Sequence, residues 1–384
     1  MKSCMESQVF EKLAKIAGGI MNPEIEDWKK QGGKVIGYFC PVVPEELIIA
    51  AGVLPFRMRA TGSTSTSRAD VYFTDFNCDF PRHCFNQALL GNYDFLDGII
   101  IPTCCDTIRR LWENWLHAGI KPSFIYQFDH VHASREVMVG RERDQLLKFK
   151  KSIEQHFKVE ISDQSLQQAI SLCNESRRLQ QKLYELRKMD SPPITGSETV
   201  AVMVASSSMP REQYNKDLRA LLDELGAIKS DTKYKARLMI VGSGHDDVFL
   251  SGIIEEMGAA LVTDNTCYGP RLFVQTVEEG GTDPLLALAK YQVMDTPYCP
   301  KMMGAHEKRL QLVLDLARDY RVDGIIGEIF LGCDPWGGEI FMLRSELKDA
   351  GIPFISYERE FVPSLEGQIK TRVEAFLEMM GKGM

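Results

Sequence analysis

Short hydrophobic runs alternate with amphipathic segments along most of the chain. In the first third, runs typical of buried strands lie at 34–39, 54–58, 97–101 and 123–128. Helices are predicted at 44–51, where a proline is followed by two acidic residues, and at about 107–116. Strands that alternate with helices in this way predict a parallel sheet with helices on both faces.

A second series of hydrophobic runs follows a long polar stretch. Residues 141–190 have a helical period and many charges, which predicts long exposed helices, and the sequence SPPITG at 191–196 ends that pattern. Further strands are expected at 199–205, 236–242, 259–263, 324–329 and 353–357. Helical patterns at 7–31 and at about 366–380 flank the two series.

These patterns predict an α/β protein with two similar Rossmann-like parallel-sheet domains. A chain of 384 residues is too long for one ordinary core and suits two domains. The expected parts are an N-terminal helical segment at 1–32, a first α/β domain at 33–140, a helical linker at 141–196 and a second α/β domain at 197–384.

The two halves also share a short sequence pattern. FLDGIIIPTCCD at 95–106 and RVDGIIGEIFLGCD at 321–334 both contain an Asp-Gly-Ile-Ile strand that is followed by Cys-Asp, a helix and another strand. Ligands of open α/β sheets lie at the carboxyl ends of the strands. If the two domains face each other, Cys105 and Cys333 both point into the cleft between them. Cys78 lies in an irregular stretch that could reach the same cleft.

Composition narrows the possible functions. A net charge of −8 argues against a nucleic-acid partner, because phosphate binding needs clustered Lys and Arg. Residues 1–9 lack the apolar region of a secretory signal, and the apolar runs are too short to span a membrane. We therefore expect a cytoplasmic protein whose ten cysteines are metal ligands, catalytic groups or core residues rather than disulfides.

Three thiolates that converge from distant positions suit an iron–sulfur cluster. With Cys78, Cys105 and Cys333 as ligands, a fourth iron position would stay open for water or substrate. From the residues alone, buried structural thiols and a zinc site remain alternatives, because the sequence has no CxxC…CxxC pattern.

The remaining cysteines are weaker candidates. Cys40 ends the first strand and could line the same cleft or belong to the core, and Cys104 is expected to point away from its neighbour Cys105. Cys84 is expected to pack in the core. Cys267 and Cys299 lie after strands or in loops and could surround the site. No role is assigned to two cysteines that are expected at surface or helical positions, Cys4 and Cys173.

Six segments together resemble a known family. They are GYFCPVVPEELIIAAGVLPFRM, FNCDFPRHC, DFLDGIIIPTCCDTIRRLWENW, TDNTCYGPRLF, VDGIIGEIFLGCDP and GIPFISYEREFVPSLEGQIKTRVEAFLEMM. In this order they look like the 2-hydroxyacyl-CoA dehydratase component D family, which also includes the cluster-bearing subunits of ATP-dependent benzoyl-CoA reductase. The resemblance covers about residues 30–384.

The resemblance implies a cofactor, partners and a reaction. It implies two similar α/β domains with a [4Fe–4S] cluster between them, held by Cys78 in FNCDF, Cys105 in TCCDTI and Cys333 in LGCDPW. It further implies a heterodimer with a paralogous subunit and a separate ATP-hydrolysing iron–sulfur activator that supplies one electron. The reaction would be elimination of water from a (R)-2-hydroxyacyl-CoA through a ketyl radical, which makes the protein a subunit of a lyase.

Alternatives within the family and outside it stay open. The chain could be a benzoyl-CoA reductase-type subunit that reduces an aromatic acyl-CoA, or a non-catalytic electron-relay subunit in which Cys40 is a fourth ligand. Family members with a double-cubane cluster use extra cysteines at places that here hold residues 91–93 and 242–244, which counts against that type. A structural zinc protein is the alternative outside enzymology.

Other polar residues have simpler expected roles. Glu45 and Glu46 at a helix start suit the helix dipole, and Asp106 and Asp334 after their cysteines are expected to cap the next helix. Solvated or structural roles are expected for three arginines, Arg109, Arg110 and Arg271, although they could meet CoA phosphates. GSGHDD at 242–247 is not a phosphate-binding motif, so ATP chemistry is expected on a partner.

Overall fold

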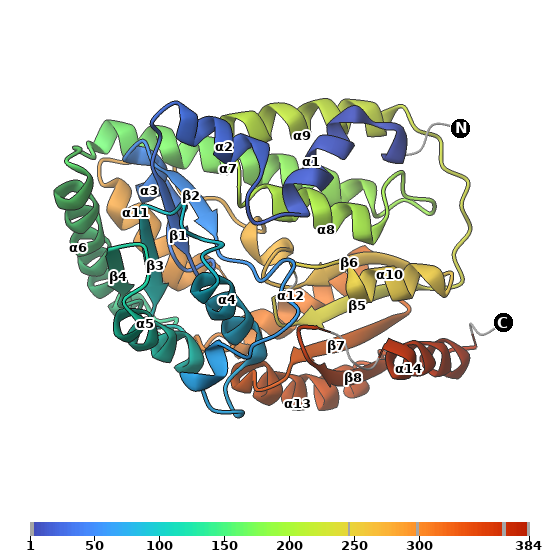
Figure 1. Cartoon of the computed structure of the whole chain (residues 1–384). Coiled ribbons are helices and arrows are strands. Elements are labelled where there is room, and N and C mark those ends of the chain that lie inside the picture. Colours follow the sequence, from blue (N-terminus) through green and yellow to red (C-terminus); the bar gives the residue numbers. More distant parts are fainter. Residues whose placement is uncertain (1–3, 245, 297–298, 363–365, 382–384) are drawn as a thin grey trace.

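Two four-stranded parallel sheets organise the chain (Figure 1). The computed structural model describes residues 4–244, 246–296, 299–362 and 366–381. The first sheet has the order β2-β1-β3-β4 and is formed by β1 (Val35–Tyr38), β2 (Leu54–Arg57), β3 (Gly98–Pro102) and β4 (Phe124–Phe128). β1, β2 and β3 are buried along their whole length, as expected for parallel strands covered on both faces.

The second sheet repeats the strand order of the first. It has the order β6-β5-β7-β8 and is formed by β5 (Arg237–Gly242), β6 (Ala260–Asn265), β7 (Gly324–Phe330) and β8 (Phe354–Arg359). In each sheet, therefore, the first strand in sequence has the second strand on one side and the third strand on the other, and the fourth strand lies next to the third. The predicted α/β class is confirmed, and eight of the nine expected strands are present within a residue or two of their expected bounds.

Helices cover both sheets and connect them. Those of the first half are α3 (Glu45–Ala50), α4 (Asp79–Leu89), α5 (Asp106–Ala118) and α6 (Val139–Phe157). The connecting helices are α7 (Asp163–Leu186), α8 (Gly196–Ala205) and α9 (Arg211–Gly226). Those of the second half are α10 (Phe249–Glu256), α11 (Pro284–Lys290), α12 (His306–Asp319), α13 (Asp334–Asp349) and α14 (Glu366–Met379).

One expected strand is a helix. The segment 199–205 is rich in β-branched residues, which predicts a strand, but it forms most of α8. Thr195 and Glu198 make a reciprocal capping box that starts the helix, and this local signal outweighs strand propensity. α8 packs against α1 (Gln8–Ala17), α10 and β6, so it is apolar nearly all round. The second sheet therefore begins only at Arg237.

The helical pattern at 7–31 is interrupted. It forms two helices, α1 and α2 (Pro23–Lys30), because Gly18 ends the first and Asn22 accepts two backbone hydrogen bonds at the start of the second. α1 packs on α8 and α9, and Figure 1 shows these helices together with α7 along one side of both sheets. The expected domain boundaries stay a prediction.

The two halves of the chain meet at the carboxyl ends of their strands. In each sheet the strand order reverses between the first and third strands, and ligands of such sheets lie in the crevice at that point. Cys40 follows β1, Cys105 follows β3 and Cys333 follows β7. The loop before α4 also contacts the loop after β7, since the N–H of Asp79 donates to the carbonyl of Leu331 at 3.0 Å.

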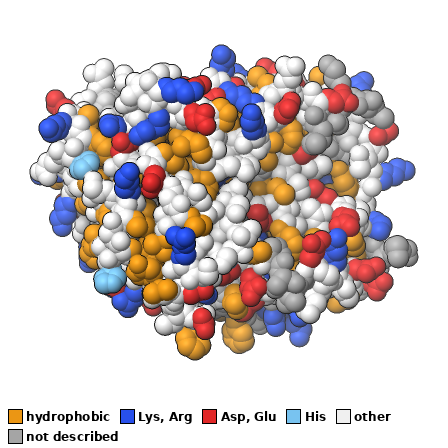
Figure 2. Space-filling model, in the orientation of Figure 1, with side chains coloured by type: hydrophobic (Ala, Val, Ile, Leu, Met, Phe, Trp, Pro, Cys, Tyr) orange, Lys and Arg blue, Asp and Glu red, His pale blue; other side chains and the backbone are white. Residues whose placement is uncertain are grey.

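The surface has no uniform charge on the face that Figure 2 shows, where acidic and basic side chains are interspersed. Within the described part of the chain, no helix is long and apolar enough to cross a bilayer.

Candidate functional site

Cys78, Cys105 and Cys333 line one small cavity between the two halves. The cavity has a volume of about 40 Å³, and Lys301 also lines it. Each of the three cysteines is the residue that immediately precedes a helix: Cys78 precedes α4, Cys105 precedes α5 and Cys333 precedes α13. Three helix N-termini therefore converge on the three thiols.

The helix N-termini favour negative charge on sulfur. Within the described residues none of the three sulfurs makes a regular capping hydrogen bond. A backbone N–H nevertheless lies close enough to each sulfur to lower the thiol pKa, from Phe80 at Cys78, from Ile108 at Cys105 and from Trp336 at Cys333. Free N–H groups and the aligned helix dipoles stabilise anions at such positions.

The thiols are electrostatically linked. A hydrogen bond between Cys78 and Cys333 lowers the pKa of Cys333 to about 7 and raises the pKa of Cys78 well above its usual value. Burial, with a smaller contribution from Cys40, raises the pKa of Cys105 to about 12. Lys301 partly offsets this effect on Cys105. Of the three thiols, Cys333 is therefore the first to lose its proton and become a thiolate.

The three cysteines of this cavity are of the ligand type that iron–sulfur clusters use. Within the described ranges, no three Cys, His, Asp or Glu side chains are placed as ligands of one metal ion. Each of the three cysteines also stands at a helix N-terminus, which favours the thiolate form that binds iron. Because Cys78 and Cys333 are hydrogen-bonded to each other, binding through all three requires those side chains to turn apart. Their role as ligands stays a prediction.

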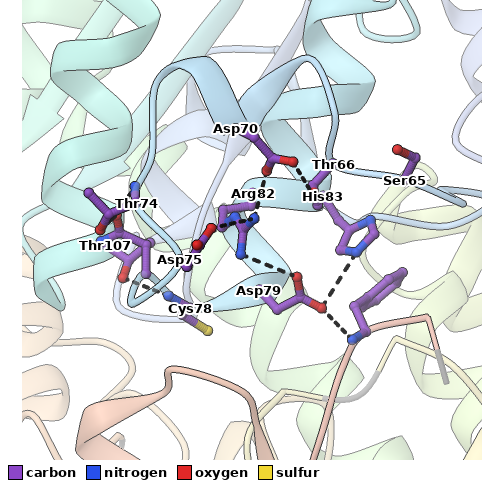
Figure 3. A network of polar contacts seen from close by, with 12 residues as sticks. Ser65, Thr66, Asp70, Thr74, Asp75, Cys78, Asp79, Arg82, His83 and Thr107 are labelled. Atoms are coloured by element: carbon purple, nitrogen blue, oxygen red, sulfur yellow. Dashed lines mark hydrogen bonds and ion pairs between the residues drawn. The ribbon is translucent and has the colours of Figure 1, made fainter. Parts of the chain in front are cut away.

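A polar network holds the Cys78 loop in place (Figure 3). The N–H of Cys78 donates to Oγ1 of Thr107 at 3.1 Å, which ties this loop to the first turn of α5. Asp79 accepts a 2.6 Å hydrogen bond from the N–H of Phe361 and lies 3.5 Å from Nε2 of His83. Burial raises the pKa of Asp79, but His83 and the Phe361 N–H outweigh it and lower the pKa below its usual value. A carboxylate therefore links Cys78 to the segment after β8.

Further cysteines lie close to the three predicted ones, since Cys40 and Cys299 both interact electrostatically with Cys333. Cys40 has a left-handed backbone conformation with φ of 59° and is hydrogen-bonded to Cys104, which lowers the pKa of Cys40. Cys104 thus points to Cys40, in agreement with the expectation that it points away from its neighbour. Burial raises the pKa of Cys299, and Cys267 and Cys333 raise it further. The expectation that Cys40 lies near the cleft is supported.

The cysteines outside this group are core residues. Cys84 is fully buried in α4, as expected, and Cys173 is buried in α7. Cys4 is expected at a surface or helical position. It belongs to a short 3-10 helix but is only 2% exposed, because it packs with α1, α8 and α9 in one hydrophobic cluster.

A second, arginine-rich cavity of about 70 Å³ is lined by Arg57, Arg177 and Arg211, and also by Pro41, the residue after Cys40. Glu45 accepts hydrogen bonds from Tyr38 and Arg211, and Glu46 pairs with Arg177 at 2.6 Å. Both glutamates are in the first turn of α3, as the helix-dipole expectation requires. Their buried pairing with arginines from α7 and α9 is an additional role, which the spacing along the chain could not predict.

Arg57 lines the same cavity without an acidic partner among the described residues. Its guanidinium lies 3.9 Å from the ring centre of Tyr268 and donates to the carbonyl of Cys267 at 2.7 Å. Burial lowers the pKa of Arg57, but Tyr268 and Cys267 outweigh this and raise it. Arg57 therefore keeps a buried positive charge, and this charge lowers the pKa of the nearby Cys40.

The expected helix caps are wrong by one position. The capping positions are held by the cysteines, and Asp106 and Asp334 are the first residues of α5 and α13, where their charge suits the helix dipole. Arg109 and Arg110 are exposed, as expected. Arg271 is structural: it is 1% exposed and donates to backbone carbonyls of Thr266, Gly242 and Asn265.

Lys301 is a residue of the cavity lining that the sequence did not predict. It lines the cysteine cavity and lies 3.8 Å from Asp106, but it belongs to a loop with no motif. In GSGHDD, Asp247 pairs with Arg359 at 2.8 Å, whereas His245 lies outside the described residues. For Lys301, its closeness to Cys299 in the sequence was the one available signal.

Comparison with known proteins identifies the relatives of this chain. Residues 40–380 match the family model of the 2-hydroxyglutaryl-CoA dehydratase D-component. The chain is 28% identical over 369 residues to the (R)-phenyllactyl-CoA dehydratase beta subunit of Clostridium sporogenes, covering 94% of this chain and 96% of that one. It is 27% identical over 340 residues to a benzoyl-CoA reductase subunit of Thauera aromatica, covering 86% and 87%. It is 26% identical over 380 residues to the beta subunit of the (R)-2-hydroxyglutaryl-CoA dehydratase of Acidaminococcus fermentans, covering 97% and 99%.

Proposed function

Because the chain belongs to the 2-hydroxyglutaryl-CoA dehydratase D-component family, we propose that it is the iron–sulfur subunit of a 2-hydroxyacyl-CoA dehydratase. The enzyme eliminates water from a (R)-2-hydroxyacyl-CoA after one-electron activation. The observation that carries this proposal is the arrangement of Cys78, Cys105 and Cys333 at three helix N-termini around one cavity.

The chain's own residues have distinct parts in this proposal. Cys78, Cys105 and Cys333 hold a [4Fe–4S] cluster, and the N-termini of α4, α5 and α13 balance its negative charge. When bound, the cluster would pass on the low-potential electron that the activator supplies and would offer an iron position that acts as a Lewis acid. Arg57 keeps a positive charge close to Cys40, where a negatively charged acyl oxygen would be stabilised.

The proposal includes partners and a compartment. The relatives are each named as one subunit of an enzyme, which supports a complex with a paralogous subunit. An ATP-hydrolysing iron–sulfur activator is the source of the electron. The many unpaired thiols fit a cytoplasmic location, where thiols are kept reduced.

A reductase role is the second candidate. The identity to the benzoyl-CoA reductase subunit, 27%, lies between the identities to the two dehydratase subunits, 28% and 26%. In that case the same cysteine site would serve reduction of an aromatic acyl-CoA. The two roles differ in the substrate that is consumed.

The test uses the chain purified without oxygen together with its paralogous subunit and activator. Iron and sulfide are measured first, and the complex is then given ATP, a strong reductant and either a (R)-2-hydroxyacyl-CoA or benzoyl-CoA. The dehydratase proposal expects an enoyl-CoA product that depends on ATP. Zinc in place of iron and sulfide would refute the cluster, and reduction of benzoyl-CoA without dehydration would favour the reductase.

A further inference from the structure

A large cavity lies away from the cysteines. It has a volume of about 490 Å³, which is within the range of small-molecule sites. Its apolar wall includes Ala14 and Ala17 of α1, Val200 and Val204 of α8, Phe249 of α10, and Phe361. Among the described lining residues, none is shared with the cysteine cavity or the arginine-rich cavity, so it is a separate feature of the fold.

Two polar atoms in this wall lack partners among the described residues. Asp246 is 8% exposed, and its Oδ2 accepts a hydrogen bond from the N–H of Ala60 at 3.1 Å. Its Oδ1 has no hydrogen-bond partner within the described ranges, and the same holds for Oγ1 of Thr61. Both atoms are buried, and both residues line the cavity. Buried polar atoms are seldom left unpaired, so two beside one apolar cavity point to a ligand that pairs with them once the two side chains turn toward it.

The charges at this site favour a hydrogen-bond donor over an anion. Asp247 also lines the cavity, and its carboxylate is paired with Arg359. Burial and the nearby Asp247 raise the pKa of Asp246 to about 6, although the positive charge of Arg59 opposes them. Asp246 is therefore largely a carboxylate at neutral pH, and it makes no ion pair with the described part of the chain. A second carboxylate would be repelled here, whereas an amino or hydroxyl group would be bound.

We propose that this cavity binds a small apolar molecule whose amino or hydroxyl group donates a hydrogen bond to Asp246 and contacts Thr61. The body of the molecule lies against the small side chains of α1 and α8. The site goes beyond the proposed acyl-CoA reaction and does not depend on it, because it needs neither the cysteines nor a partner subunit.

The test is a matched series of four indole compounds, measured by isothermal titration calorimetry on the purified full chain. Tryptamine carries an ammonium head, tryptophol a hydroxyl, 3-ethylindole no polar head, and indole-3-propionate a carboxylate. Tryptamine or tryptophol should bind roughly tenfold more tightly than 3-ethylindole, the effect of one hydrogen bond to a charged group. Indole-3-propionate should bind most weakly. The tighter of the first two identifies the head group that the site takes.

Three variants locate the binding. Asp246→Asn should reduce the preference for the polar head to less than about twofold, because it removes the charged acceptor. Thr61→Val should weaken binding while leaving the melting temperature unchanged or higher, since it removes an unpaired buried hydroxyl. Ala201→Phe should abolish binding by filling the cavity that Ala201 lines, and Ala227→Phe, at an exposed position, is the control for an added ring.

The outcomes decide the proposal. Absence of binding by any compound, equal binding of all four, or full tryptamine binding by Ala201→Phe would overturn it. If Ala201→Phe does not fold, the isosteric Thr61→Val carries the test instead, and unchanged affinity for both tryptamine and tryptophol there counts against the site. A result for this site leaves the acyl-CoA proposal untouched, because none of these measurements uses CoA substrates.

Discussion

Gly332→Ala should break the contact that holds two of the three cysteine loops together. Gly332 precedes Cys333 and has φ of +76°, a left-handed conformation that costs a residue with a Cβ about 1–2 kcal/mol. A Cβ at this position would also lie 2.9 Å from the backbone of Asn77 and Phe76. Backbone atoms cannot rotate away, and such overpacking costs about 1–3 kcal/mol more. The expected loss is therefore roughly 2–5 kcal/mol of unfolding free energy.

Gly351→Ala is the matched control. Gly351 has φ of +71°, but a Cβ there would meet nothing within 4 Å, so only the backbone cost of about 1–2 kcal/mol applies. Urea unfolding of both variants and the parent, without oxygen, gives the two differences in free energy. Iron content after purification is the second readout, because the Gly332→Ala clash pushes the loop of Asn77 away from Cys333. Equal losses in the two variants, with equal iron content, would refute the reasoning.

Three further predictions address the thiols and the pH dependence. Cys105→Ser should lower the iron and sulfide content and the absorbance near 400 nm, whereas full cluster content would exclude Cys105 as a ligand. Cys40→Ser should keep the cluster spectrum and its response to acyl-CoA, because Cys40 is hydrogen-bonded to Cys104 rather than to the three predicted ligands; loss of iron on metal analysis would instead identify a fourth ligand. Burial lowers the pKa of His306, but the neighbouring Glu346 and Glu339 have the larger effect and raise this pKa above 6.5. The ion pairs of protonated His306 therefore stabilise the fold fully below about pH 6.5, and this stabilisation is lost as the pH rises through the raised pKa. Thermal unfolding of His306→Asn and the parent should therefore differ most at about pH 6 and converge with rising pH; a difference that grows instead would contradict the ion pairs.

Local sequence patterns were sufficient for much of the fold. Buried strands such as 97–101 and 324–329 could be recognised because each is a short apolar run with clear ends. The shared Asp-Gly-Ile-Ile pattern placed Cys105 and Cys333 after equivalent strands, and β3 and β7 do hold equivalent places in the two sheets. The segment 199–205 is a helix despite its β-branched composition, because the capping box in front of it decides its conformation.

Contacts between distant segments could not be predicted in the same way. The pairing of Glu46 with Arg177 spans 131 positions, and the bond from Arg57 to the Cys267 carbonyl spans 210. Neither has a local signature, because each depends on how the helical layer lies across the two sheets. Lys301 could not be predicted for the same reason: its loop reaches the cysteine cavity only in the folded chain.

The three cysteines occupy positions where a helix prefers another residue. Ser, Thr, Asp or Asn at the position before a helix accepts a hydrogen bond from a free N–H and contributes about 0.5–2 kcal/mol. Cys78, Cys105 and Cys333 hold this position at α4, α5 and α13 without a regular cap within the described residues, and all three meet at one cavity. A local rule that is broken three times at one place indicates that function, not folding, selects the residue. Serine is the better helix cap but the poorer iron ligand. Cys105→Ser should therefore raise the stability of α5 and, at the same time, lower the iron content of the site.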